Sequence, residues 1–232
     1  MIKSALEYII GLKKPETIEI DGRTFINGGY HPVLSPYNAT VNLHTLTGLV
    51  DIIKKEYGGE NLVINIKSHT EVEVVSCVYG EEMQRDIHYT VTAILPSLNF
   101  GRSMEMESFI IELQSKFMPD ENRNNLLNFA SRVRFDDNQE IYDNGVSQMV
   151  TVKTGVAKLE NTQTPNPVKL RPFRTFHNVE QPASDFIFRI DKNRGFMLVE
   201  ADGGAWKSEA MQNIKAYLQE AFKDFPDITV IA

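Results

Sequence analysis

The chain has 232 residues, of which 42% are hydrophobic, enough to bury a core in one large domain or two small ones. Its formal net charge is −7 and its pI is about 5.3, so nucleic acid repels it unless its basic groups are segregated. Cys77 is the only cysteine, which excludes an intrachain disulfide, and no apolar run reaches the roughly 18 residues of a membrane span, so no membrane partner is expected.

The first 39 residues are predicted to form an N-terminal helix and hairpin arm, followed by an α+β core domain over residues 40–232. The segment Met1–Leu12 has an apolar stripe, carries an acidic residue and lacks a small-residue cleavage site. It is therefore predicted to be an amphipathic docking helix rather than a signal peptide. Two short β-prone runs then flank Asp21-Gly22, which is a strong hairpin signal.

The core domain is predicted to begin with a strand, a helix and a group of three strands. Thr45 is the expected N-cap of a helix whose apolar stripe continues to Tyr57. The three β-prone runs after it are predicted to form an antiparallel meander with one solvated face, over Leu62–Ile66, Val72–Val78 and Ile87–Leu95.

The rest of the core domain is predicted to hold two helices, two strands, a hairpin and a long amphipathic C-terminal helix. In that order they cover Met106–Phe117, Asp120–Leu127, Ala130–Phe135, Gln148–Val152, Phe186–Val199 and Trp206–Phe225. Because the strands come in hairpin-like groups rather than alternating singly with helices, the predicted fold class is α+β, with amphipathic helices packed on mostly antiparallel sheet.

Several stretches of this layout resemble a known family. They are the helix Leu46–Tyr57 with the meander after it, Phe100 with Met106–Phe109, the phrase Asn128–Phe135, the Pro172-Phe173 step and the hairpin before the last helix. In these features the chain resembles the YfdQ-like family of uncharacterised phage and prophage proteins, although it is shorter than is typical for that family. The family has no established catalytic residues to carry over. The resemblance implies a phage- or prophage-encoded accessory protein in a host bacterial cytoplasm.

No catalytic constellation stands out in the sequence, and neither a metal nor a cofactor is predicted. The five histidines are scattered without the spacing of metal ligands: His31, His44, His69, His88 and His177. A restriction-type nuclease would need an acid two residues before Lys67, and Asn65 holds an amide there. The protein is therefore expected not to be an enzyme.

One basic and aromatic part of the sequence is typical of phosphate binding and base stacking. Its candidate anion- or nucleotide-binding residues are Arg132, Arg134, Lys169, Arg171, Phe173 and Arg174. The competing explanation, which we prefer, is that these arginines lie on the solvated faces of edge strands with phenylalanines beneath them.

A second candidate lies at the start of the last helix. The Gly203-Gly204 turn is followed by Lys207 and Ser208, and free N–H groups at a helix N-terminus can hold a phosphate. The segment departs from a Walker loop because Trp206 replaces the glycine before Lys-Ser, and Asp202 nearby repels anions. The preferred explanation is a tight entry into the helix with both polar side chains solvated.

Three functions remain open on the sequence alone. The first is a non-enzymatic phage or prophage accessory protein that works as a homo-oligomer, with itself as partner. The second is a nucleotide-binding, sponge-type counter-defence protein. The third is a recombination accessory that binds single-stranded nucleic acid, which the acidic net charge disfavours.

Overall fold

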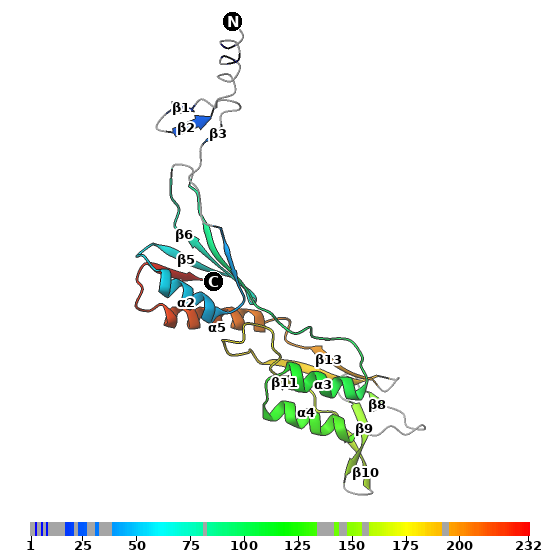
Figure 1. The fold of residues 1–232 in the computed structure, drawn as a ribbon. Coiled ribbons are helices and arrows are strands. Elements are labelled where there is room, and N and C mark those ends of the chain that lie inside the picture. Colours follow the sequence, from blue (N-terminus) through cyan, green and yellow to red (C-terminus); the bar gives the residue numbers. More distant parts are fainter. Residues whose placement is uncertain are drawn as a thin grey trace. The chain divides into compact units, whose positions relative to one another are not determined.

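A computed structural model of the chain describes residues 3, 6, 8, 17–20, 23–26, 31–32, 39–80, 83–133, 142–143, 148–154, 158–191 and 195–232 (Figure 1). The chain divides into two units, Met1–Ala39 and Thr40–Ala232. Helices pack on mostly antiparallel sheets, so the predicted α+β class is confirmed. Within the described residues, no helix has both the length and the apolar composition needed to cross a bilayer.

The first unit contains a three-stranded antiparallel sheet in the order β1-β2-β3, formed by Thr17–Ile20, Arg23–Ile26 and His31–Pro32. The predicted hairpin is therefore present, although its Asp21-Gly22 turn lies outside the described residues. The predicted helix Met1–Leu12 also falls largely outside them, with helical conformation described at residues 3, 6 and 8. Exposure is described for residues 3, 6, 8, 17–20, 24, 25 and 39 of this unit, and none of these is buried.

A five-stranded sheet in the order β14-β5-β6-β7-β4 forms one half of the second unit. Its strands, in chain order, are β4 (Val41–Leu43), β5 (Leu62–Ser68), β6 (Glu71–Ser76), β7 (Ile87–Thr92) and β14 (Ile228–Ile231). The strands β5, β6 and β7 are antiparallel, which confirms the predicted meander, and the two edge strands are parallel to their neighbours.

Two helices, α2 (Leu46–Glu56) and α5 (Trp206–Ala221), pack on one face of this sheet (Figure 1). The predicted cap of α2 is confirmed, because the Thr45 hydroxyl accepts a hydrogen bond from the Gly48 N–H at 3.1 Å. Alternate residues of β5 and β6 meet the apolar stripes of both helices in a mainly aliphatic cluster, the sheet core, centred on Ile64, Val74 and Leu218.

The other half of the second unit has its own core, built largely of phenylalanine. A three-stranded antiparallel sheet in the order β11-β12-β13 packs against two helices. The elements are β11 (Val168–Leu170), β12 (Ser184–Ile190), β13 (Phe196–Glu200), α3 (Met106–Lys116) and α4 (Glu121–Arg132). The rings of Phe109, Phe188 and Phe196 lie within 5.4 to 5.7 Å of one another, centroid to centroid, at the centre of this phenylalanine core.

Side-chain amides extend the hydrogen bonding of β12 where β11 does not reach. β11 pairs with β12 only from Ser184 to Phe186. Beyond that point, the Asn166 amide accepts from the Phe188 N–H and donates to the Phe188 carbonyl, at 2.6 and 2.8 Å. The Gln148 amide does the same for Ile190, at 2.7 and 2.9 Å. The two side chains thus replace a neighbouring strand.

Some predicted boundaries were wrong. The segment Ala130–Phe135 was predicted to be a strand, whereas α4 continues through it to Arg132 and begins at the predicted Asp120 cap. The last helix, α5, has 16 residues and ends at Ala221, because the chain then turns to enter β14. Three further strands form a separate antiparallel sheet in the order β10-β9-β8, over Lys158–Gln163, Gln148–Thr154 and Tyr142–Asp143.

Candidate functional site

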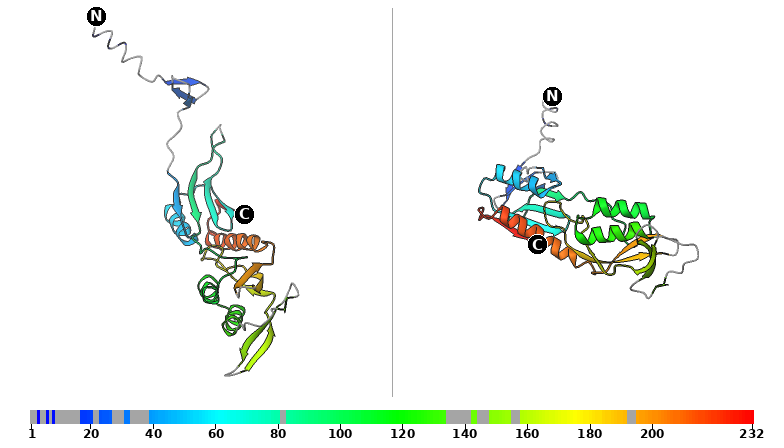
Figure 2. Two further views of the ribbon diagram at one scale, coloured as in Figure 1. Left: turned by 90° about the vertical axis from the view of Figure 1, so that its right-hand side faces the viewer. Right: turned by 90° about the horizontal axis from the view of Figure 1, so that it is seen from below.

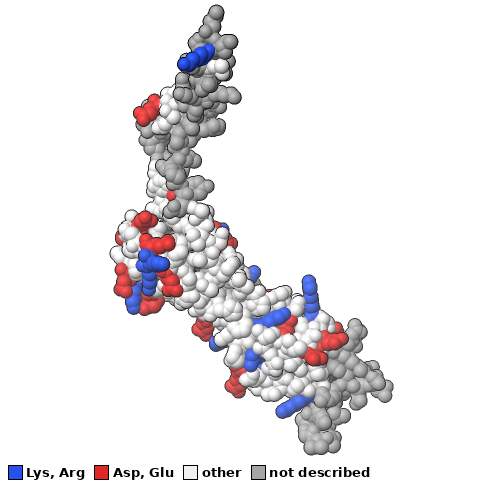
Figure 3. All heavy atoms as spheres, in the orientation of Figure 1, with Lys and Arg blue, Asp and Glu red and all other residues white. Residues whose placement is uncertain are grey.

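The predicted basic residues do not form one basic surface. On the face of the second unit drawn in Figure 3, Lys and Arg side chains are interspersed with Asp and Glu. Arg132 is the exposed last residue of α4, so its predicted alternation with Arg134 on a strand is wrong. Arg134 itself lies outside the described residues.

The segment from Lys169 to Arg174 places its basic side chains in three different environments. Lys169 is exposed on β11, between the buried Val168 and Leu170. Arg171 forms an exposed ion pair with Glu180 at 3.2 Å. An exposed pair of this kind is screened by solvent and holds neither side chain firmly.

Arg174 is buried, at 4% exposed, and its own chain supplies its partners. One guanidinium nitrogen donates to the Glu200 carboxylate at 2.6 Å, and another donates to the Ser184 hydroxyl. Burial lowers the pKa of Arg174, while the charges of Glu200 and Asp202 act to raise it. The charge of this arginine is therefore compensated inside the protein and is not presented to a phosphate.

The phenylalanines of the segment are also separated. Phe176 is buried in the sheet core. Phe173 is half-buried against His177, with the ring centroids 5.0 Å apart. Because the two rings do not lie on one exposed surface, they offer no joint platform for stacked bases.

The glycine turn before α5 is hydrogen-bonded to the protein's own carboxylate. Gly203 and Gly204 have φ angles of 63° and 83°, a conformation that favours glycine. The Gly204 N–H donates to Asp202 at 3.1 Å. Burial acts to raise the pKa of Asp202, but hydrogen bonds from Ser184 and Gly204, with the charge of Arg174, lower it on balance. Lys207 and Ser208 are exposed, as we expected for a tight entry into the helix with both side chains solvated.

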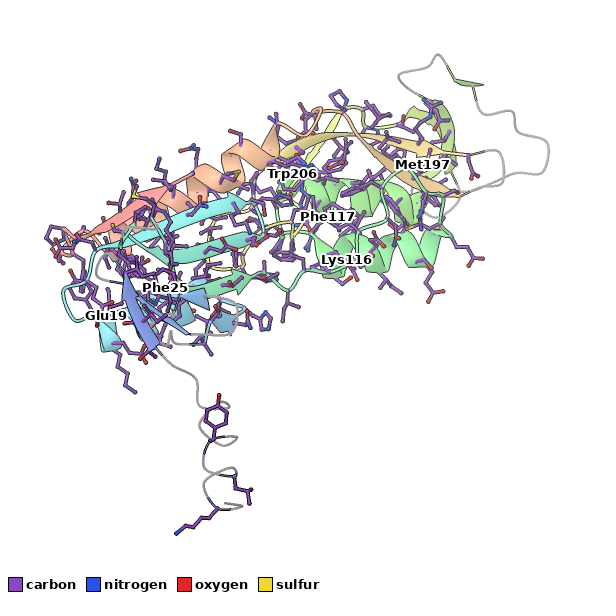
Figure 4. The ribbon with its side chains drawn as sticks, turned by 90° about the horizontal axis from the view of Figure 1, so that it is seen from above. Glu19, Phe25, Lys116, Phe117, Met197 and Trp206 are labelled. Atoms are coloured by element: carbon purple, nitrogen blue, oxygen red, sulfur yellow. The ribbon has the colours of Figure 1, made fainter. Side chains whose placement is uncertain are left out.

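Trp206 brings the two predicted candidates together. The Arg174 guanidinium lies 3.9 Å from the centroid of the indole, and the Lys207 ammonium lies 5.8 Å from it. His69, at the turn between β5 and β6, meets the same ring edge-on at 4.7 Å. Figure 4 shows Trp206 at the start of α5, between the five-stranded sheet and the part of the unit that holds α3 and α4.

This Trp206 junction joins the segment around Arg174 to the β5–β6 turn. The Thr175 hydroxyl donates to the His69 carbonyl at 2.6 Å. The Gln181 amide accepts from the N–H groups of Arg174 and Thr175, at 3.0 and 3.2 Å, which fixes the turn of the chain. The contacts of the junction are therefore those of a structural connection between two cores.

Some buried hydrogen-bond donors have no acceptor, and two of them lie at the junction. Among the described residues, Arg174 Nε, Trp206 Nε1 and Arg123 Nε are buried and have no hydrogen-bond partner. The face of the Arg174 guanidinium contacts the indole, an arrangement that favours packing over full hydrogen bonding. Both atoms at the junction are buried, so an external ligand cannot reach them in this conformation.

Sequence reasoning missed most of this junction. It proposed Arg174 and Lys207 but placed them in separate candidates, and it treated Trp206 as the first apolar residue of the last helix and as a departure from a phosphate loop. The available signal was the single tryptophan, next to a lysine in the first turn of an amphipathic helix.

The described residues include no group of three or more His, Cys, Asp or Glu side chains positioned to hold a metal ion. A scan against protein-family models, a search of curated proteins and a search of solved structures each found no match to this chain. Function must therefore be inferred from the chain's own residues.

Proposed function

We propose that the protein is a non-catalytic accessory protein of phage or prophage origin that works as an assembly of copies of itself. One observation carries the self-assembly: where the exposure of residues in Met1–Ala39 is described, at 3, 6, 8, 17–20, 24, 25 and 39, none of them is buried. A unit of about 40 residues or fewer seldom buries enough surface to be stable alone, and it usually depends on disulfides, metals or association. Cys77, the single cysteine, lies outside this unit, so association is the route we favour.

The edge strand β1 offers the surface for association. Its four side chains are all exposed, with Ile18 at 37% and Ile20 at 48%, and these two point to the same face. An exposed edge strand with apolar side chains pairs readily with a strand of another chain. Antiparallel pairing of β1 with β1 of a second copy, about a two-fold axis, would merge two three-stranded sheets and cover both isoleucines.

Two further observations support the rest of the proposal. The layout of residues 40–225 resembles the YfdQ-like family, which favours a phage or prophage accessory protein acting in a bacterial cytoplasm. Nucleotide or single-strand binding has less support, because Arg174 and Arg171 are engaged by Glu200 and Glu180. Because these two arginines form ion pairs within the chain, their contacts are consistent with a non-catalytic, self-assembling role.

The test is the native mass of the full-length protein, measured by light scattering after gel filtration at micromolar concentration. We expect a multiple of the chain mass of 26.4 kDa. The double variant Ile18→Asp/Ile20→Asp should reduce that mass, because it puts two like-charged pairs across the β1 contact. Ile111→Asp on α3, where the isoleucine is 55% exposed, is the matched control and should leave the mass unchanged. A monomeric wild-type protein would overturn the proposal.

A further inference from the structure

We draw no further inference here: the strongest candidate, the hairpin that joins β6 to β7 and extends beyond the end of the five-stranded sheet (Figure 2, left), has exposed apolar side chains at Val78, Tyr79 and Met83, but nothing in the described part of the chain shows what covers it.

Discussion

The sheet core and the phenylalanine core differ in how their strands complete their hydrogen bonds. β6 lies between β5 and β7 and pairs with both across Val72 to Val74. β12 pairs with β13 on one side, while on the other its backbone depends on the amides of Asn166 and Gln148 beyond Phe186. Backbone hydrogen bonds between strands remain when one apolar side chain replaces another. A hydrogen bond made by a single side chain is lost when that residue is replaced. The phenylalanine core should therefore be the more sensitive to single substitutions.

The largest expected effect comes from Phe188→Ala. Phe188 is fully buried, and its ring lies 5.4 Å from that of Phe109 and 5.7 Å from that of Phe196. Its removal leaves a cavity and should lower the free energy of unfolding by about 3–5 kcal/mol. Urea denaturation followed by the fluorescence of Trp206, the single tryptophan, gives the measurement.

A matched pair of milder variants sharpens the comparison between the cores. Ile64→Leu in the sheet core conserves volume and should cost less than about 1.5 kcal/mol. Phe188→Leu also loses aromatic contacts with its neighbours, each contributing about 0.5–1.5 kcal/mol beyond the area buried, and should cost more. Equal losses from the two leucine variants would show that the cores are equally tolerant.

The next effect in size concerns the amide that takes the place of a strand. Asn166→Leu removes both hydrogen bonds to Phe188 and leaves a buried N–H and a buried carbonyl unpaired. We expect a loss of at least about 2 kcal/mol, since each of the two unpaired buried groups costs about 1–3 kcal/mol. Hydrogen exchange should show faster exchange of the Phe188 N–H. If that N–H stays as protected as in the wild type, the amide does not serve β12. Asn124→Leu, at an exposed position on α4, is the control.

The elements that sequence patterns predicted well are the ones that local chemistry determines. Thr45 and Asp120 cap their helices as expected, since an N-cap acts on N–H groups only two or three residues away. The alternation of Glu71 and Glu73 with Val72 and Val74 predicted one solvated face of β6, and the two valines are buried. Such short-range patterns determined most of the sheet core.

Elements that depend on distant partners were missed. β14 pairs with β5, more than a hundred residues away in the chain, and its four residues carry no pattern that fixes this partner. Arg174 lies between Phe173 and Phe176 in a segment that reads as a solvated basic stretch, so the sequence gave no sign of its burial among Glu200, Ser184 and Trp206. A buried, compensated charge becomes visible only when the tertiary contacts are known.

The smallest expected effect tests the junction between the two cores through pH. Burial lowers the pKa of His69, and the positive charges of Lys207 and Arg174 lower it further. As the pH falls below about 6.5, the unfolded chain therefore binds a proton that the folded protein resists, and stability declines. His69→Gln should remove this part of the decline between about pH 6.5 and pH 5. Lys207→Gln should reduce it as well, because the pKa of His69 then moves toward its ordinary value. The measurement is the urea midpoint of unfolding across this pH range. If the midpoint falls with pH in both variants as steeply as in the wild type, His69 does not couple the Trp206 junction to pH.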